Sequence, residues 1–386
     1  MKKTLLALAV LGAAAGTAVA ADVQLYGVLD YGLKYTHTDN DDGTDATDKL
    51  EMATGSQSGP RWGLTASEEL GNGLKVGFNL ENGFNADDGT LGNNGRLFGR
   101  ICSMYVEGNY GRLIFGREGQ LNSANGTVGI SGIFTPFGAS WGGAPEISTF
   151  FVGASRIDNS ITYKTPTVGG FSAYAQYSFD MNTREDTSLS QTEGKSSSNR
   201  YAALAAQYKA GPANFVAIAD WYNWSSTQAD RKDVDDGYSI TAGGNYDLGA
   251  AKVYAGVQYF DNMIKATSAD VTTKDTFAKI GTGINGQIKG YGVMAGVDTP
   301  VLGGTAMFAV GYTSTEEADP AADVEKTESD RWGVGVGYTY NLSKRTNLYG
   351  VAAYYQDELK NEHTANGDRD RDPSSTSVVI GIRHKF

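Results

Sequence analysis

The chain alternates apolar and polar residues in segments of about ten residues, and this alternation continues from residue 23 to the C-terminus. In the last segment, Val378, Ile380 and Ile382 share one face with the C-terminal Phe386. A period of two places successive side chains on opposite faces, so each segment predicts a β-strand with one apolar and one polar face. The segments predict about sixteen strands, near residues 23–36, 60–70, 73–84, 95–108, 111–118, 158–166, 170–179, 199–209, 213–223, 237–247, 251–261, 286–298, 303–313, 330–341, 346–356 and 375–386.

The connections between these segments alternate between short turns and long loops. Gly71 to Gly73 and Gly211-Pro212 are short, whereas residues 37–59, 182–199 and 261–285 form long polar loops. An even number of short strands joined in this way is typical of an outer-membrane barrel, whose tilted strands need only ~9–11 residues to cross the hydrocarbon. We therefore predict an all-β fold, a transmembrane antiparallel β-barrel with short periplasmic turns and long external loops. A secreted β-sandwich or propeller is the alternative, because its strands alternate in the same way.

The first twenty residues have the features of an export signal rather than of a strand. Lys2 and Lys3 precede a short apolar stretch, and Ala18-Val19-Ala20 fits the small-residue cleavage pattern. The apolar stretch, roughly residues 5–15, is shorter than the ~20 residues of a membrane-spanning helix. We expect residues 1–20 to be a signal peptide and residues 21–386 to form a single barrel domain.

Composition and charge narrow the function classes. The 386 residues include 44 acidic and 32 basic side chains, a formal net charge of −12, which argues against a nucleic-acid partner because such partners bind basic surfaces. Glycine is abundant, at 51 residues, and has no collagen-like triplet repeat, as expected for many strands joined by turns. The single cysteine, Cys102, excludes an internal disulfide and a zinc cluster built on cysteines.

Catalysis by a barrel enzyme is the main competing class, and the histidines argue against it. His37 and His363 fall in long loops, and His384 falls on the outward face of the last strand. None of the three is placed in the barrel interior as a general base. We therefore expect that the protein is not an enzyme.

The first long loop is acidic, with five aspartates between residues 39 and 48. It does not match a calcium-binding EF-hand, because Gly43 does not fall at the sixth position counted from Asp39. We expect no cofactor and no specific metal site. Loosely bound divalent cations that bridge these external loops to lipopolysaccharide are the most that this composition supports.

Several short motifs, taken in their order along the chain, resemble those of the general trimeric porins of Gram-negative outer membranes, in particular the proteobacterial type. The resemblance covers the whole mature chain. Each motif is weak alone, but the ordered set is specific. The motifs are Val23-Gln24-Leu25-Tyr26-Gly27 with Asp30, Arg61-Trp62-Gly63-Leu64, Ser67-Glu68-Glu69-Leu70-Gly71, Leu80-Glu81-Asn82-Gly83-Phe84, Phe98-Gly99-Arg100, Tyr110-Gly111-Arg112, Phe115-Gly116-Arg117, Arg156-Ile157-Asp158-Asn159-Ser160-Ile161-Thr162-Tyr163 and Phe386.

This resemblance implies sixteen strands, a homotrimer and a third external loop folded into the pore, a place that residues 118–155 occupy. That segment is apolar, glycine-rich and nearly uncharged, unlike the other long loops. A barrel of this size leaves an aqueous lumen that side chains cannot fill, so a compact inward loop would narrow it. The implied function is passive diffusion of small hydrophilic solutes and ions across the outer membrane. Lipopolysaccharide, outer-membrane lipid and the barrel-assembly machinery, through the C-terminal strand ending in Phe386, are the expected partners.

By the same resemblance, the basic side of the pore constriction consists of wall arginines, and the acidic side lies on the loop. The alternation independently turns Arg61 inwards, because it shares a face with Gly63 and Thr65. An alternative role for each arginine is purely structural, in a ladder with carboxylates such as Glu81 or with loop carbonyls. The predicted basic residues are Arg61, Arg100, Arg156 and Arg117, and the predicted acidic residues are Glu146 and Glu118.

The charges near the constriction predict a mild anion preference. Apart from Glu118 at its base, the loop has only Glu146 as an acid, and Val28 stands where many relatives have a basic residue. Acids at the mouth would favour cations, but exposed charges are screened over ~8–10 Å at physiological salt. The alternative function is a substrate-specific channel for sugars or small anions. A sugar path would need lumen-facing aromatic rings, whereas the favoured interpretation has the loop aromatics anchor the loop to the wall; these are Phe134, Phe137, Trp141, Phe150 and Phe151.

Overall fold

The computed structural model describes residues 23–141, 143–183, 193–224, 234–264, 286–320, 324–364 and 367–386. The predicted signal peptide, residues 1–20, lies outside this part of the chain. None of the helices in the described segments is long and apolar enough to cross a membrane.

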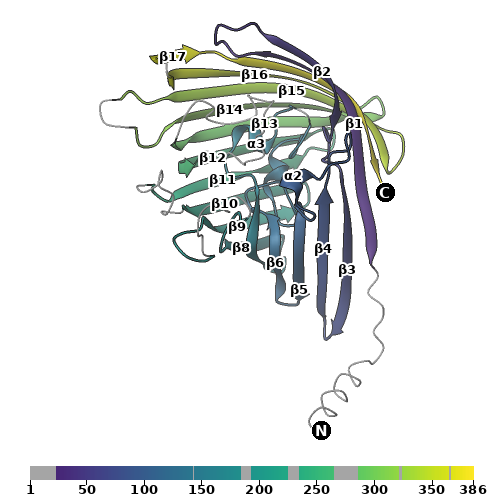
Figure 1. Cartoon of the computed structure of the whole chain (residues 1–386). Helices are drawn as coiled ribbons and strands as arrows, with labels where there is room; N and C mark the ends of the chain where they lie inside the picture. Colours follow the sequence, from purple (N-terminus) through teal and green to yellow (C-terminus); the bar gives the residue numbers. More distant parts are fainter. Residues whose placement is uncertain are drawn as a thin grey trace.

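The fold is a closed antiparallel barrel of sixteen strands, as predicted from the alternation. Each strand pairs with the next one along the chain, and β18 pairs with both β16 and β1, which closes the ring (Figure 1). The barrel strands are β1 (Gln24–Asp39), β3 (Arg61–Gly71), β4 (Leu74–Gly83), β5 (Ile101–Gly108), β6 (Gly111–Gly119), β7 (Arg156–Lys164), β8 (Phe171–Ser178), β9 (Arg200–Ala210), β10 (Ala213–Asn223), β11 (Gly237–Asp247), β12 (Lys252–Ile264), β13 (Gln287–Val301), β14 (Gly304–Glu317), β15 (Glu328–Asn341), β16 (Thr346–Thr364) and β18 (Ser374–Lys385).

Two further strands lie in loops that were predicted to be irregular. Strand β2 (Thr47–Thr54) pairs with the outer half of β1, and β17 (Gly367–Arg371) pairs with the end of β16. Both lie within long polar loops and were therefore assigned to the connections, although Leu50 and Met52 of β2 alternate with Lys49 and Glu51. The predicted strand 95–108 starts later, at Ile101, because residues 92–95 form the short helix α2 (Gly92–Gly95) and residues 96–100 form an irregular turn.

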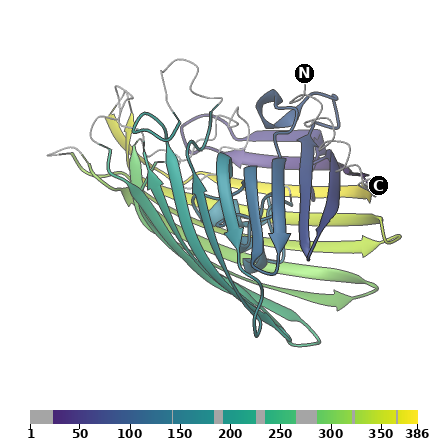
Figure 2. The ribbon, with the colours of Figure 1, turned by 90° about the horizontal axis from the view of Figure 1, so that it is seen from below.

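The two faces of each strand differ as the alternation predicts. On β10, Phe215 and Trp221 are about half exposed, whereas Val216 and Ile218 between them are buried. The exposed apolar side chains therefore lie on the outer surface of the barrel. Figure 2 shows the tilted strands that form this surface. The inner face of the same strand is covered by a loop that enters the barrel.

The seam between the first and last strands is bridged from inside by a side chain of a third strand. Gly32 on β1 and Gly381 on β18 are paired, and the Tyr349 ring of β16 lies across them. The Tyr349 hydroxyl donates a hydrogen bond of 2.6 Å to Asp30 on β1. Asp30 is fully buried and also accepts from the backbone N–H groups of Gln57 and Ser58. The seam is thus held by side chains in addition to its backbone ladder.

Candidate functional site

Residues 120–155, between β6 and β7, form a loop that lies inside the barrel; we call it the inward loop. Its 3₁₀ turn η1 (Ser131–Phe134) contacts β11, β12 and β13, and its short helix α3 (Ile147–Phe150) contacts β13 and β14. Figure 1 shows α3 within the ring of strands. Strands β3 to β7 therefore stand across the lumen from the part of the wall on which the loop rests.

The inward loop is seated on glycines of strands β11 to β15; we call this part of the barrel the glycine wall. A Cβ at Gly311 would lie 2.3 Å from the Phe150 ring, and one at Gly335 would lie 2.4 Å from Pro145. Any larger residue would collide with the loop, so the absence of side chains here makes room for its rings. The same holds at the other seats, which are Gly243 and Gly256 for Phe134, Gly296 for Pro136, Gly337 for Phe137 and Gly292 for Phe151.

The aromatic residues of the inward loop are anchors, as the favoured interpretation of the sequence has it. Phe134 and Phe150 are fully buried, Phe137 and Phe151 are 2% exposed, and Trp141 is 8% exposed. Rings in this position cannot present a face to a solute in the lumen. The described part of the loop therefore offers no aromatic path of the kind that a sugar channel needs.

Glu118, predicted as a pore acid, lies at the base of the inward loop and does not reach the lumen. Its carboxylate is fully buried and accepts hydrogen bonds from the Ser103 hydroxyl and from both the N–H and the hydroxyl of Thr127. Three donors satisfy the buried charge, which would otherwise be costly. The geometry corrects the sequence-based assignment: Glu118 holds the start of the loop and does not line the passage.

Arg61 and Arg100 face the interior and share one carboxylate. The Arg100 Nε donates to Glu81 Oε1 at 2.7 Å, and the Arg61 Nε lies 3.6 Å from Glu81 Oε2. The Tyr26 hydroxyl donates to the same Oε2. The side chain of Arg100 keeps 17% of its surface exposed and that of Arg61 keeps 23%, so both are anchored and also accessible from the lumen. Arg61 and Arg100 thus have both roles: they form the structural ladder with Glu81, and they also contact the passage.

Arg156 is the predicted arginine that has no carboxylate partner. It begins β7, where the inward loop rejoins the wall, and no described carboxylate lies within ion-pair distance of it. Its Nε is buried without an acceptor. Arg100, Arg117, Glu81 and Arg61 all interact with it electrostatically. Arg117 is paired with Asp158, so Arg61, Arg100 and Arg156 form one group of three positive charges near a single carboxylate, Glu81. We call strands β3 to β7, together with Arg100 directly before β5, the arginine wall.

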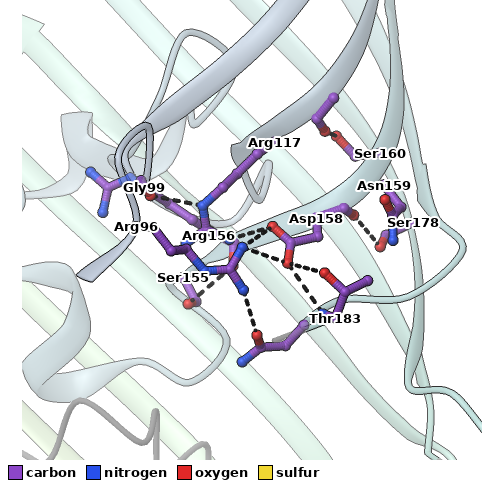
Figure 3. Close-up of polar contacts among 12 residues, drawn as sticks. Arg96, Gly99, Arg117, Ser155, Arg156, Asp158, Asn159, Ser160, Ser178 and Thr183 are labelled. Atoms are coloured by element: carbon purple, nitrogen blue, oxygen red, sulfur yellow. Dashed lines mark hydrogen bonds and ion pairs between the residues drawn. The ribbon is translucent and has the colours of Figure 1, made fainter. Parts of the chain in front are cut away.

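Arg117 belongs to a different cluster, centred on Asp158. Along β6 it shares its face with Phe115, opposite the inward-facing Ile114 and Glu118, and it pairs with the exposed Cys102. Its guanidinium donates to Asp158 at 2.7 Å and to the Gly99 carbonyl. Figure 3 shows Arg96 and Arg117 converging on this carboxylate. The alternation thus turns Arg117 away from the inner face. Contrary to the prediction, Arg117 does not line the passage but ties neighbouring loops together.

The Asp158 cluster was missed at the sequence level. Asp158 also accepts from the N–H and hydroxyl of Thr183, and Arg96 reaches Asn182 as well, so the cluster joins the loops that follow β4 and β8 to the wall. Arg96 lies in a connection, where period-two alternation gives no orientation. Asp158 follows Arg156 in a matched motif, but only the bulge between β6 and β7 brings it opposite Arg117.

Glu146 is the one acid of the inward loop beyond its base. Its Oε1 accepts from the Ser148 hydroxyl at 2.8 Å, and its Oε2 is buried without a hydrogen-bond partner. Burial raises the pKa of Glu146 to about 8, because the charged form has lost its hydration. At neutral pH the loop therefore carries little negative charge towards the lumen. Among the described residues, no group of three or more His, Cys, Asp and Glu could hold a metal ion.

Comparison with known proteins agrees with this architecture. Residues 7–360 match the family model described as Gram-negative porin. The chain is 33% identical to an outer membrane porin protein of Bordetella pertussis (strain Tohama I) and 29% identical to outer membrane porin protein 32 of Delftia acidovorans, each over the full length of both chains. Among solved structures, it resembles an anion-selective porin from Comamonas acidovorans with a TM-score of 0.63 and 26% identity, covering 95% of this chain and 100% of that one. The chain thus belongs to the Gram-negative porin family, as a multi-pass β-barrel of the outer membrane.

Proposed function

We propose that this porin is a passive diffusion channel for small hydrophilic solutes and ions, with a mild preference for anions. The observation that carries the preference is the group of three arginines: Arg61 and Arg100 share the single carboxylate Glu81, and Arg156 beside them has no ion-pair partner among the described carboxylates. Opposite them, the loop offers only Glu146, whose charge is suppressed at neutral pH. Fixed charges in a narrow passage act on an ion with little screening, so this local excess outweighs the acidic total of the chain.

The remaining parts of the proposal follow from the family. We propose a homotrimer in the outer membrane, in contact with lipopolysaccharide and lipid, whose C-terminal strand ending in Phe386 is the segment that the barrel-assembly machinery engages. Conduction needs no cofactor and no bond chemistry, so we propose no enzymatic activity. The acidic external loops would hold divalent cations only loosely. The relative from Comamonas acidovorans that is described as anion-selective supports the sign of the preference.

Reversal potential in a salt gradient across a planar bilayer tests the proposal. Wild-type protein should give a potential of the anion-selective sign, and Arg61→Ala and Arg100→Ala should each move it towards zero or beyond. Arg112→Ala is the matched control, because Arg112 lies on the inner face of β6 but stacks on Tyr105, away from the Glu81 group. A wild-type potential of the opposite sign, or equal shifts in all three variants, would reject the assignment. The absence of conductance would reject the channel itself.

A further inference from the structure

A glutamine on β8 holds the first limb of the inward loop by its backbone. The Gln176 side-chain oxygen accepts from the Leu121 N–H at 3.0 Å, and its amide nitrogen donates to the Gly119 carbonyl at 2.9 Å. The same nitrogen also donates to the hydroxyl of Thr162, its cross-strand partner on β7. The side-chain amide thus pairs with the loop as a strand residue would pair with a neighbouring strand.

A second glutamine holds the other limb in the same way. On β12, the Gln258 oxygen accepts from the Val152 N–H at 2.6 Å, and its amide nitrogen donates to the Val152 carbonyl at 3.2 Å. The nitrogen also donates to the hydroxyl of Thr241, its cross-strand partner on β11. The arrangement of Thr162 and Gln176 is therefore repeated on the far side of the loop. We call the two arrangements Thr–Gln clasps.

Both clasps are hidden from the lumen. The two glutamines are 3% and 2% exposed, and the two threonines are fully buried. They cannot contact a permeating solute, so they do not line the passage. An irregular loop inside a barrel lacks a ladder partner for its backbone, and a buried unpaired N–H or C=O is costly. The clasps supply these partners at two points, one on each limb.

The two loop residues held by the clasps, Leu121 and Val152, lie within four positions of a charged residue in the chain. Leu121 follows the base residue Glu118 by three positions, and Val152 precedes Arg156 by four. The limbs are also joined to each other, because Gln120 pairs with Ser155 through backbone and side chain. A limb that leaves the wall would therefore carry Arg156 with it and change the distance between this arginine and Arg100.

We propose that the two Thr–Gln clasps are positioning elements that fix both limbs of the inward loop, and that they thereby set the open-channel conductance and its ion selectivity. This inference rests on the proposed function. With both limbs fixed and the middle seated on the glycine wall, the loop is a static part of the constriction. Gln176 and Gln258 act on a permeating ion only through the loop.

The test compares Gln176→Met and Gln258→Met with Gln207→Met in single-channel recordings. Methionine keeps the length of glutamine but cannot form the paired hydrogen bonds. Gln207 on β9 is the matched control, because it bonds to Tyr174 and Asn214 on the wall and not to the inward loop. Loss of two hydrogen bonds should raise the population of a detached limb roughly 10- to 100-fold. Both clasp variants should then show increased open-channel noise and sub-conductance levels, and Gln207→Met should not.

Gln258→Glu separates positioning from a general loss of stability. A protonated glutamic acid can both accept from the Val152 N–H and donate to its carbonyl, whereas the ionised form cannot donate. Because burial favours the protonated form, the noise should be low at acidic pH and should rise as the pH is raised and the introduced carboxyl ionises, a profile that wild-type protein and Gln258→Met should lack. Quiet channels in both clasp variants, or noise in Gln258→Glu that does not respond to pH, would overturn the inference. The wild-type sign of selectivity, measured in the same recordings, tests the proposed function independently.

Discussion

The arginine wall and the glycine wall of this barrel differ in both strand length and chemistry. Strands β5, β6 and β7 of the arginine wall have eight or nine residues, whereas β13, β14 and β15 of the glycine wall have fourteen or fifteen. The arginine wall carries the charges, with Arg61 on β3, Glu81 on β4 and Arg156 on β7, and the glycine wall carries the seats of the inward loop. One wall thus supplies the field in the passage, while the other fixes the distance over which the field acts.

The largest effect is expected from filling a seat on the glycine wall. Gly311→Ala would place a methyl group 2.3 Å from the Phe150 ring, which is fully buried and has no room to shift. Overpacking of this kind typically costs about 1–3 kcal/mol. We expect a lower unfolding midpoint in detergent and a loop pushed towards the arginine wall, seen as reduced single-channel conductance.

Gly350→Ala is the control for this substitution. The nearest atom to a Cβ at Gly350 on β16 is 3.7 Å away, which is ordinary contact, so stability and conductance should stay close to wild type. If the two alanine variants behaved alike, the seats would not determine the position of the loop.

A smaller effect, on ion selectivity and not on stability, is expected from a substitution in the arginine wall. Glu81→Gln removes the carboxylate that Arg61 and Arg100 share, while its one side-chain oxygen can still accept from Arg100 and its amide nitrogen can donate to the Tyr26 hydroxyl. The net charge of the group rises by one, so the reversal potential should move further in the anion-selective direction. Glu69→Gln, on the same β3–β4 pair but exposed beside Lys75, should leave it unchanged. A shift towards cations in Glu81→Gln would contradict the proposed role of the wall.

The ion selectivity of the channel should also depend on pH. Burial raises the pKa of Glu146 to about 8, so this loop acid is neutral below that pH and negative above it. As the pH rises from 6 to 9, a negative charge appears opposite the arginines, and anion preference should decline. Reversal potentials over this range should show the decline in wild-type protein and should lack it in Glu146→Gln. An unchanged profile in the variant would assign the titration to another group.

The smallest effect is expected at the mouth. Replacing Asp42, Asp45 and Asp48 of the first loop by Asn removes three negative charges, of which those of Asp45 and Asp48 are exposed. Over the ~8 Å Debye length at 0.15 M salt they act weakly on the constriction, but at 0.01 M the length grows to ~30 Å. We expect no measurable shift in the reversal potential at 0.15 M and a shift towards anions at 0.01 M. A clear shift at 0.15 M would show that charges at the mouth, and not those of the arginine wall, determine the selectivity.

The fold was predictable because hydrophobic alternation is local and period two repeats along every barrel strand. Alternation also placed Arg61 on the inner face. It could not place Arg96, which lies in a connection, and it could not anticipate the bulge at which Arg117 meets Asp158. Bulges depend on the pairing of two strands and leave no periodic signal in either one.

The seats and clasps were beyond the sequence for a related reason. An abundance of glycine is visible in composition, but which glycine receives which ring depends on the path of a loop that has no periodicity. Gln176 and Gln258 have no distinguishing neighbours in the chain, and only the barrel brings each beside a threonine and the loop backbone. Glu118 was misassigned because a charge beside a loop can either line the passage or be consumed in supporting the loop.

The Tyr349 bridge across the seam has a consequence for how the barrel forms. Its hydrogen bond to Asp30 joins residues 319 positions apart, and the ring rests on a glycine from each end strand. Contacts between the two ends of a chain are slow to form, because the whole intervening chain must first be brought into register. The bridge can exist only once β1, β16 and β18 are all in place, so it marks completion. A barrel that has not yet closed lacks this contact, and the last step of assembly is the one that buries Asp30.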